Sequence, residues 1–198
     1  MREGSLAKLD VADRIRSGER TGALTASIVN LVRPFIKVAQ LSRLDIAFRR
    51  PPRTPRTVQD LMSIELTSGE LVDPNELAIG IIEDGRFLLE LAHDLDAVVT
   101  KALDIGHRLF GGSEDRIGRF GDLRRVYFVQ ERDRPESEDE PDRFHTGIAP
   151  STKLLYAVVS RLHDVDAVAA MVLLRRWRET PTPIHVRLWS AFSREAHA

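Results

Sequence analysis

The strongest constraint on the fold is an unbroken apolar repeat in the middle of the chain. Its members recur at alternating steps of three and four residues, which places them along one side of a helix. They are Leu88, Leu91, Leu95, Val98, Ala102, Ile105 and Leu109. Such a seam predicts one long helix that packs lengthwise against another helix. Gly111 and Gly112 mark its expected end, because glycine tolerates the left-handed conformation found there.

Shorter apolar repeats predict helices before this seam. One is expected over residues 5–17, and a second begins at Leu24 and runs towards Leu41. Pro34 would either kink the second helix or begin a new one, since a missing N–H costs nothing in a first turn. An aspartate followed by proline at positions 73 and 74 predicts a further helix over 74–83.

The C-terminal region carries three more helix signals. Ser151, Asp164 and Thr182 each precede an apolar repeat and are typical helix caps. The connectors between these repeats are only a few residues long, and short connectors favour antiparallel neighbours. The predicted fold class is therefore all-α, a helical bundle followed by stacked helical hairpins, with an irregular charged linker between them.

Charge divides the chain further. We predict a helical bundle over 1–112, an irregular charged hinge over 113–149 and helical-repeat hairpins over 150–198. Within the bundle, residues 1–56 hold 12 Lys/Arg against 5 Asp/Glu, a net of +7, whereas residues 57–110 hold 3 against 11, a net of −8. Two such segments attract each other within the chain, or else the basic one faces an anionic partner.

Composition excludes several classes of protein. The 198 residues include no cysteine, so disulfide frameworks, thiolate metal sites and cysteine nucleophiles are ruled out. No apolar run approaches the roughly 18 residues of a membrane span, which predicts a cytoplasmic protein without a membrane partner. The six histidines include no pair at the i, i+4 spacing of a helical metal site. We therefore expect neither a metal nor a cofactor.

A proline-rich arginine segment is the candidate basic patch. It runs from Phe48 to Arg56 and includes Arg49, Arg50, Arg53 and Arg56. Arginines held apart by proline can meet phosphates, so nucleic-acid binding is one interpretation. No aromatic residue alternates with them to stack on bases, and a stiff solvated linker is the favoured interpretation.

Two residues of the seam region form the candidate catalytic pair. Arg86 and His93 resemble the Arg-x(4–6)-His motif of HEPN ribonucleases, although Phe87 stands where those enzymes usually carry a polar residue. The resemblance implies a metal-independent ribonuclease, in which the imidazole acts as base or acid and the guanidinium stabilises the developing phosphorane. The sequence contains no P-loop, GxSxG or HExxH motif.

The C-terminal aromatic residues are the candidate interaction residues. Trp177 and Trp189 lie on successive predicted helices, where the two tryptophans fit an inter-helix core better than a nucleobase-stacking pair, and Phe192 follows Trp189 on the same helix. No further helix follows to cover Trp189 and Phe192. We therefore expect this face to be covered by self-association or by other domains of a larger chain.

Residues 126–198 resemble the HEAT-like C-terminal regions of large bacterial antiphage-defence proteins that carry nucleotide-binding or sirtuin-like effector domains. The resemblance rests on the run Val126–Gln130, on Asp142, Arg143 and His145, and on a tryptophan-bearing helix followed by a proline-started one. It implies a non-catalytic scaffold or protein-interaction module within a larger defence or signalling protein. The alternatives are the ribonuclease of Arg86 and His93 and nucleic-acid binding through the basic N-terminal segment.

Overall fold

Helices dominate the chain. The structure is a computed structural model, and it describes residues 3–39, 54, 62–67, 72–110, 147–180 and 182–195. Of these residues 74% are helical, far above the roughly one-third that is typical of globular proteins. The predicted all-α class is confirmed.

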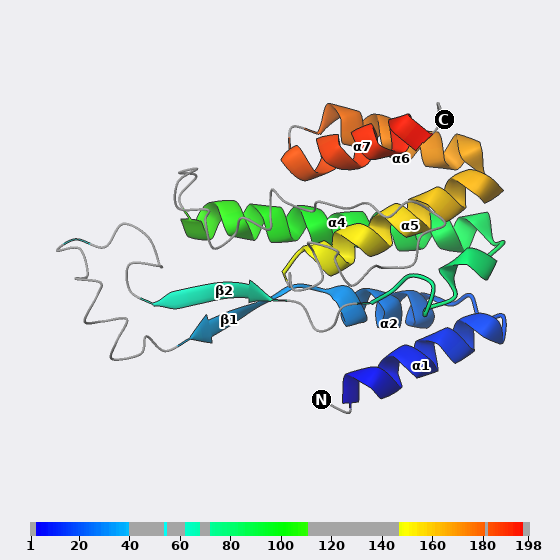
Figure 1. Ribbon diagram of the computed structural model, residues 1–198, viewed down its shortest axis with the longest axis horizontal. Coiled ribbons are helices and arrows are strands. Elements are labelled where there is room, and N and C mark those ends of the chain that lie inside the picture. The colour runs from blue at the N-terminus through cyan, green and yellow to red at the C-terminus, as the bar shows by residue number, and fades with distance from the viewer. Residues whose placement is uncertain are drawn as a thin grey trace.

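In the described part of the chain the helices form pairs that are stacked in chain order (Figure 1). The N-terminal hairpin (residues 3–32) forms one side of the stack. The long helix over 85–110 and the helix over 149–165 form the middle, and the C-terminal hairpin (residues 167–195) covers the other side. The helices are α1 (Glu3–Arg16), α2 (Gly22–Val32), α4 (Gly85–Phe110), α5 (Ala149–Val165), α6 (Ala167–Glu179) and α7 (Pro183–Glu195), with the 3-10 helix η2 (Ile79–Ile81) before α4.

The apolar seam behaves as predicted. It lies on α4, where Leu88, Leu91 and Leu95 are fully buried, and α4 packs along α5 more extensively than any other two helices pack. The start of α4 is capped by Asp84, whose carboxylate accepts a hydrogen bond from the Phe87 N–H at 3.0 Å. The expected end at Gly111 and Gly112 lies outside the described residues.

Helix α5 is the centre of the core. Nearly every side chain from Ala149 to Leu162 is buried, and one continuous cluster joins buried apolar residues from α1, α2, α4, α5, α6 and α7. The predicted cap at Ser151 is wrong, because α5 begins two residues earlier. Ser151 lies inside the first turn, and its hydroxyl donates to the Ile148 carbonyl at 2.9 Å.

The predicted helix beyond Pro34 is also wrong. Helix α2 ends at Val32, and residues Phe35–Ala39 form strand β1, which pairs antiparallel with β2 (Ser63–Thr67). Proline disfavours the helical conformation in the residue before it, and Arg33 is accordingly extended. The sequence FIKVA then supplies the β-branched and aromatic residues that favour a strand.

The helix predicted over 74–83 is reduced to one turn. The Asp73 carboxylate begins the turn by accepting from the Asn75 N–H at 2.8 Å. Ala78 then adopts a left-handed conformation with φ of 57°, and the N–H groups of Ala78 and Ile79 bond back to the carbonyls of Asn75 and Pro74. This is the Schellman arrangement that ends helices. Local backbone geometry therefore stops the helix before it can extend.

The C-terminal hairpin differs from the prediction at one cap. Asp164 is still inside α5, and Asp166 caps α6 instead by accepting from the Ala169 N–H at 3.0 Å. The predicted cap of α7 is confirmed, since the Thr182 hydroxyl accepts from the His185 N–H at 3.3 Å. Most of the predicted hinge, residues 113–146, lies outside the described part of the chain.

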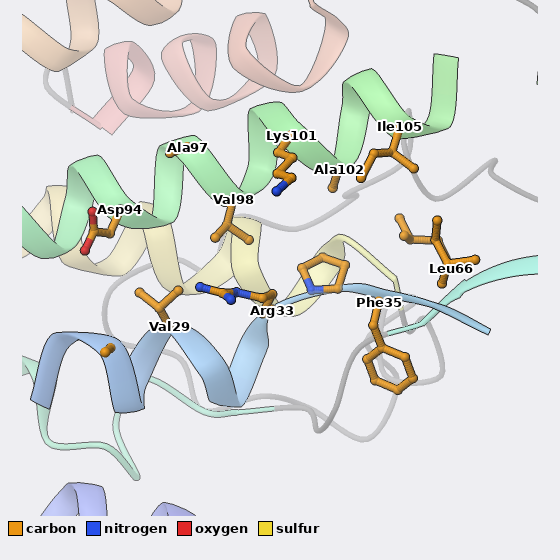
Figure 2. A pocket seen from close by; sticks show the side chains of 13 residues that line it. Val29, Arg33, Phe35, Leu66, Asp94, Ala97, Val98, Lys101, Ala102 and Ile105 are labelled. Carbon is orange, nitrogen blue, oxygen red and sulfur yellow. The ribbon is translucent and has the colours of Figure 1, made fainter. Parts of the chain in front are cut away.

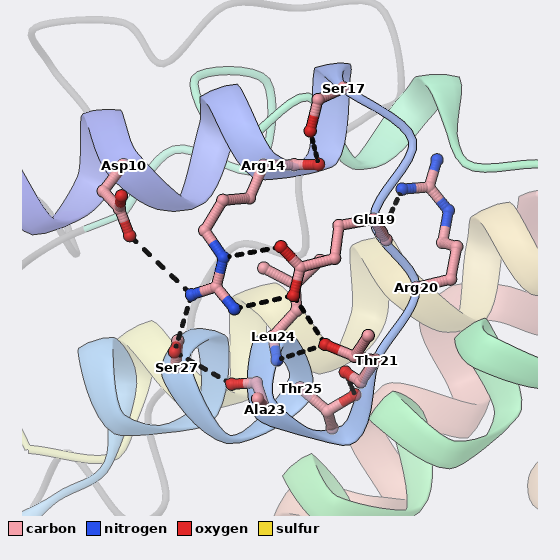
Figure 3. A network of polar contacts seen from close by, with 10 residues as sticks. All are labelled: Asp10, Arg14, Ser17, Glu19, Arg20, Thr21, Ala23, Leu24, Thr25 and Ser27. Carbon is pink, nitrogen blue, oxygen red and sulfur yellow. Dashed lines mark hydrogen bonds and ion pairs between the residues drawn. The ribbon is translucent and has the colours of Figure 1, made fainter.

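A polar network fastens α1 to α2 (Figure 3). The Arg14 guanidinium donates to both carboxylate oxygens of Glu19, at 2.9 and 2.7 Å, and reaches the Ser27 hydroxyl on α2 at 3.2 Å. The Thr21 hydroxyl donates to Glu19 and also caps α2 by accepting from the Leu24 N–H. Hydrogen bonds from Arg14 and Thr21 hold the pKa of Glu19 at about 2, well below its ordinary value of 4.5.

This network predicts an acid-sensitive hairpin. Because the folded-state pKa of Glu19 is depressed, its contribution to stability is complete above pH 4.5 and is lost as the pH falls towards 2. We expect Glu19→Gln to lower the free energy of unfolding near neutral pH and to flatten its fall between pH 4.5 and 2, as measured by urea unfolding. Arg14→Lys should cause a smaller loss of this free energy, because lysine keeps the positive charge although it cannot make both hydrogen bonds to Glu19. Parallel pH profiles for the wild type and Glu19→Gln would contradict this.

The conformation of Ala78 predicts a stabilising substitution. A non-glycine residue with left-handed geometry costs about 1 kcal/mol, so Ala78→Gly should raise the free energy of unfolding by up to about that amount. The matched control is Ala97→Gly on the exposed side of α4, which should lower the same quantity by about 0.5–1 kcal/mol. Chemical denaturation of both variants tests whether the free energy of unfolding changes in opposite directions.

Candidate functional site

A buried carboxylate lies where α4 meets the C-terminal hairpin. Asp96, in the middle of α4, is only 2% exposed. The indole N–H of Trp177 on α6 donates to its Oδ1 at 3.0 Å, and Nε2 of His185 on α7 lies 3.1 Å from the same atom. Three helices therefore meet at one carboxylate oxygen.

The second carboxylate oxygen faces a guanidinium. Nη2 of Arg176 lies 3.7 Å from Asp96 Oδ2, and the arginine side chain is largely exposed. Burial raises the pKa of the Asp96 carboxyl, but the hydrogen bonds from His185 and Trp177 and the nearby positive charge outweigh that effect and hold the pKa below its usual range. Asp96 is therefore a buried anion whose partners come from both helices of the hairpin.

The chain of contacts continues to Thr182. Its hydroxyl lies within hydrogen-bonding distance of His185 Nδ1. In the neutral ring that carries its proton on Nε2, the imidazole donates to Asp96 and Nδ1 accepts from the hydroxyl, whereas in the charged ring both nitrogens donate. This hydroxyl, imidazole and carboxylate order is also used by nucleophilic enzymes. Here the imidazole is 1% exposed and the hydroxyl caps α7, so the contacts hold the start of α7 against α4.

A separate groove lies between α2, α4 and the strand pair (Figure 2). It has a volume of about 550 Å³, and its walls are mostly aliphatic side chains from α2, α4 and β2, with Phe35 and Ile36 from β1. Three charged side chains also line it, Arg33, Asp94 and Lys101, and all three are solvent-exposed. The groove combines an apolar wall with charged groups that remain in water.

The candidate catalytic pair lies apart from this groove. Arg86 and His93 are both exposed on α4, seven residues and thus two turns apart. The Arg86 guanidinium donates to Glu90, one turn along the same helix, at 3.1 Å. Neither side chain lines the groove.

The candidate interaction residues belong to the core. Trp177 is fully buried against Asp96, and Trp189 is half-buried. Phe192 is also buried, with its ring edge-to-face with Tyr156 and His163 of α5, at centroid distances of 6.0 and 5.2 Å. The expectation that Phe192 stays uncovered is wrong, because α7 folds back and packs its ring against α5, whereas the expected core position of Trp177 is confirmed.

The remaining sequence predictions concern the basic patch, a metal site and a membrane span. The basic patch lies outside the described residues; it consists of Arg49, Arg50, Arg53 and Arg56. In the part of the chain that the structure describes, no three histidine or carboxylate side chains gather as a metal ion would require. None of the described helices combines the length and the apolar character needed to cross a membrane.

The Asp96 cluster was not predicted from the sequence. His185 lies three residues after the predicted helix cap Thr182, but a capping box has glutamate or glutamine at that position, so this pattern does not single out the histidine. One signal was an aspartate directly beside Leu95 of the seam, since an acid next to a buried face needs a partner. The partner's identity required the tertiary structure.

Comparison with known proteins adds no relative. No protein-family model matches this sequence, and no curated protein or solved structure matches it either.

We expect a conservative substitution of Asp96 to lower the stability of the protein. Asp96→Asn keeps the shape but removes the charge that both donors and Arg176 face, so the free energy of unfolding should fall by about 1–2 kcal/mol. Asp94→Asn, two residues away on the exposed side of α4, is the control and should change it by less than about 0.5 kcal/mol. Equal effects in urea unfolding would contradict the assigned role.

Proposed function

We propose that this protein is a non-catalytic helical scaffold that acts through protein contacts. The groove between α2, α4 and β1 is the observation that carries the proposal. Its walls can bury aliphatic side chains of a partner, and burial of apolar surface is the main favourable term in protein association. Its charged groups stay in water, where they help to set orientation and specificity.

The occupant that fits best is an extended or helical segment of another protein. The apolar surface does not stop at the groove, because Ile36, which lines it, and Val38, on the same face of β1, are both exposed. An apolar strip that continues along a strand suits a chain segment better than a compact ligand. Two of the three charged residues that line the groove are basic, Arg33 and Lys101, which favours a carboxylate beside the partner's aliphatic residues.

A scaffold role also agrees with the placement of the titratable groups. Asp96 and His185 are buried in a contact that joins three helices, and Arg86 is paired with Glu90 on its own helix. The wider setting, a larger cytoplasmic defence or signalling protein of bacteria, is part of the proposal and is supported by the resemblance of residues 126–198.

Site-specific photo-crosslinking tests the groove. A benzophenone amino acid at Ile36, inside the groove, should crosslink a discrete partner protein in an extract of the native host. The same probe at Ile81, which is exposed but outside the groove, should not. The partner, once identified and purified, should bind the wild-type chain, and Ala97→Glu should weaken binding by about tenfold or more by placing a charge in the groove.

The matched control is Ala7→Glu, an exposed helical alanine on α1, which should leave this binding unchanged. Equal crosslinking at Ile36 and Ile81 would contradict the proposal. A crosslink from Ile36 to the same polypeptide chain would also contradict it, because the groove would then belong to a segment of this chain.

A further inference from the structure

The exposed side of α1 is apolar at one end and acidic at the other. Leu6 and Leu9 are 67% and 57% exposed, which is unusual for leucine on a helix that also contributes to the core. Asp10 and Asp13 follow on the same side and are exposed. We call these four residues the acidic ridge.

The exposed side of α6 is apolar at one end and basic at the other. Val168, Met171 and Val172 are 79%, 43% and 63% exposed. One turn later on the same side lies Arg175, an exposed side chain. We call these four residues the basic ridge.

The two ridges share one spacing. Leu6, Leu9 and Asp13 are separated by three and then four residues, and so are Val168, Met171 and Arg175. Two parallel helices in this register would place leucine against valine, leucine against methionine and carboxylate against guanidinium. The same register places Arg16 opposite Arg178. Each guanidinium lies near a carboxylate of its own helix, Asp13 at 3.1 Å and Glu179 at 3.9 Å, which offsets part of their repulsion, and Asp13 then contacts both Arg16 and Arg175.

The ridges cannot meet within one molecule. In Figure 1, α1 and α6 lie on opposite sides of the helical stack, with α2, α4 and α5 between them. Helix α1 packs on α2, whereas α6 packs on α5, α7 and α4. A contact between the acidic and basic ridges therefore requires two copies of the chain.

We propose that copies of this chain associate head to tail, with the acidic ridge of one copy packed on the basic ridge of the next. The contact is heterologous, because it joins two different surfaces, and repetition extends it into a ring or a filament. Pairing like ridges in parallel would instead bring aspartates or arginines together. The inference rests on the proposed scaffold function but uses a surface separate from the groove.

Complementation between two blocked variants tests this contact. Leu9→Glu blocks the acidic ridge and Val168→Glu blocks the basic ridge, and both positions are exposed enough to accept glutamate without loss of fold, which circular dichroism checks. In sedimentation velocity, the wild type should grow beyond a dimer as concentration rises. Each variant alone should stay monomeric, with an association constant lowered by about tenfold or more. An equimolar mixture should form one dimer and stop, because each variant supplies the intact ridge that the other lacks.

Two further variants sharpen the test. Asp13→Arg should weaken association of the wild-type chain, and the double variant with Arg175→Asp should restore it by exchanging the charges. Ile81→Glu, at an exposed apolar residue outside both ridges, should associate like the wild type.

Three outcomes would overturn the inference. They are a wild type that remains monomeric at every concentration, a Leu9→Glu variant that still self-associates, and a mixture that forms no dimer. None of these outcomes depends on the groove, because partner binding in the groove is measured separately with Ala97→Glu. A failed head-to-tail contact and a failed scaffold function are therefore distinguishable.

Discussion

The packing of α4 along α5 is the contact on which the rest of the fold depends. One apolar side of α4 is continuous over several turns, and α5 is buried around almost its whole circumference. A helix with so little exposed surface must be covered on every side. The N-terminal hairpin and the C-terminal hairpin do this from opposite directions, which explains why a single core runs from α1 to α7.

Asp96 gives this packing its specificity. Apolar contacts between helices tolerate small shifts, whereas a buried carboxylate needs its donors in fixed positions. Because Trp177 and His185 come from different helices of the hairpin, the same anion positions α6 and α7 relative to α4. The arginine at position 176 adds positive charge from the solvent side. The cluster has the order of groups of a catalytic relay, and its carboxylate and imidazole are both buried where the three helices meet.

The proposed function depends on the apolar surfaces that remain exposed outside the core. Two hairpins that each turn their buried side inwards leave their outer sides free, and on α1 and α6 these outer sides carry aliphatic residues rather than only charged ones. The strand pair adds a third apolar surface beside the groove. A small helical stack that exposes apolar residues at several separate places is suited to bridging other proteins.

The sequence by itself determined the helical class, the long central helix and the cap at Thr182, because these depend on residues close together in the chain. The strand at Phe35–Ala39 and the single turn after Pro74 were mispredicted, although their causes are local: extended Arg33 before Pro34, and left-handed Ala78. The Asp96 cluster and the groove could not be predicted in the same way. Asp96 and His185 are 89 residues apart, and the groove joins residues from Ala26 to Ile105. Only the tertiary structure decides which helix sides meet, because a periodic pattern shows that a side must be buried but not which partner covers it.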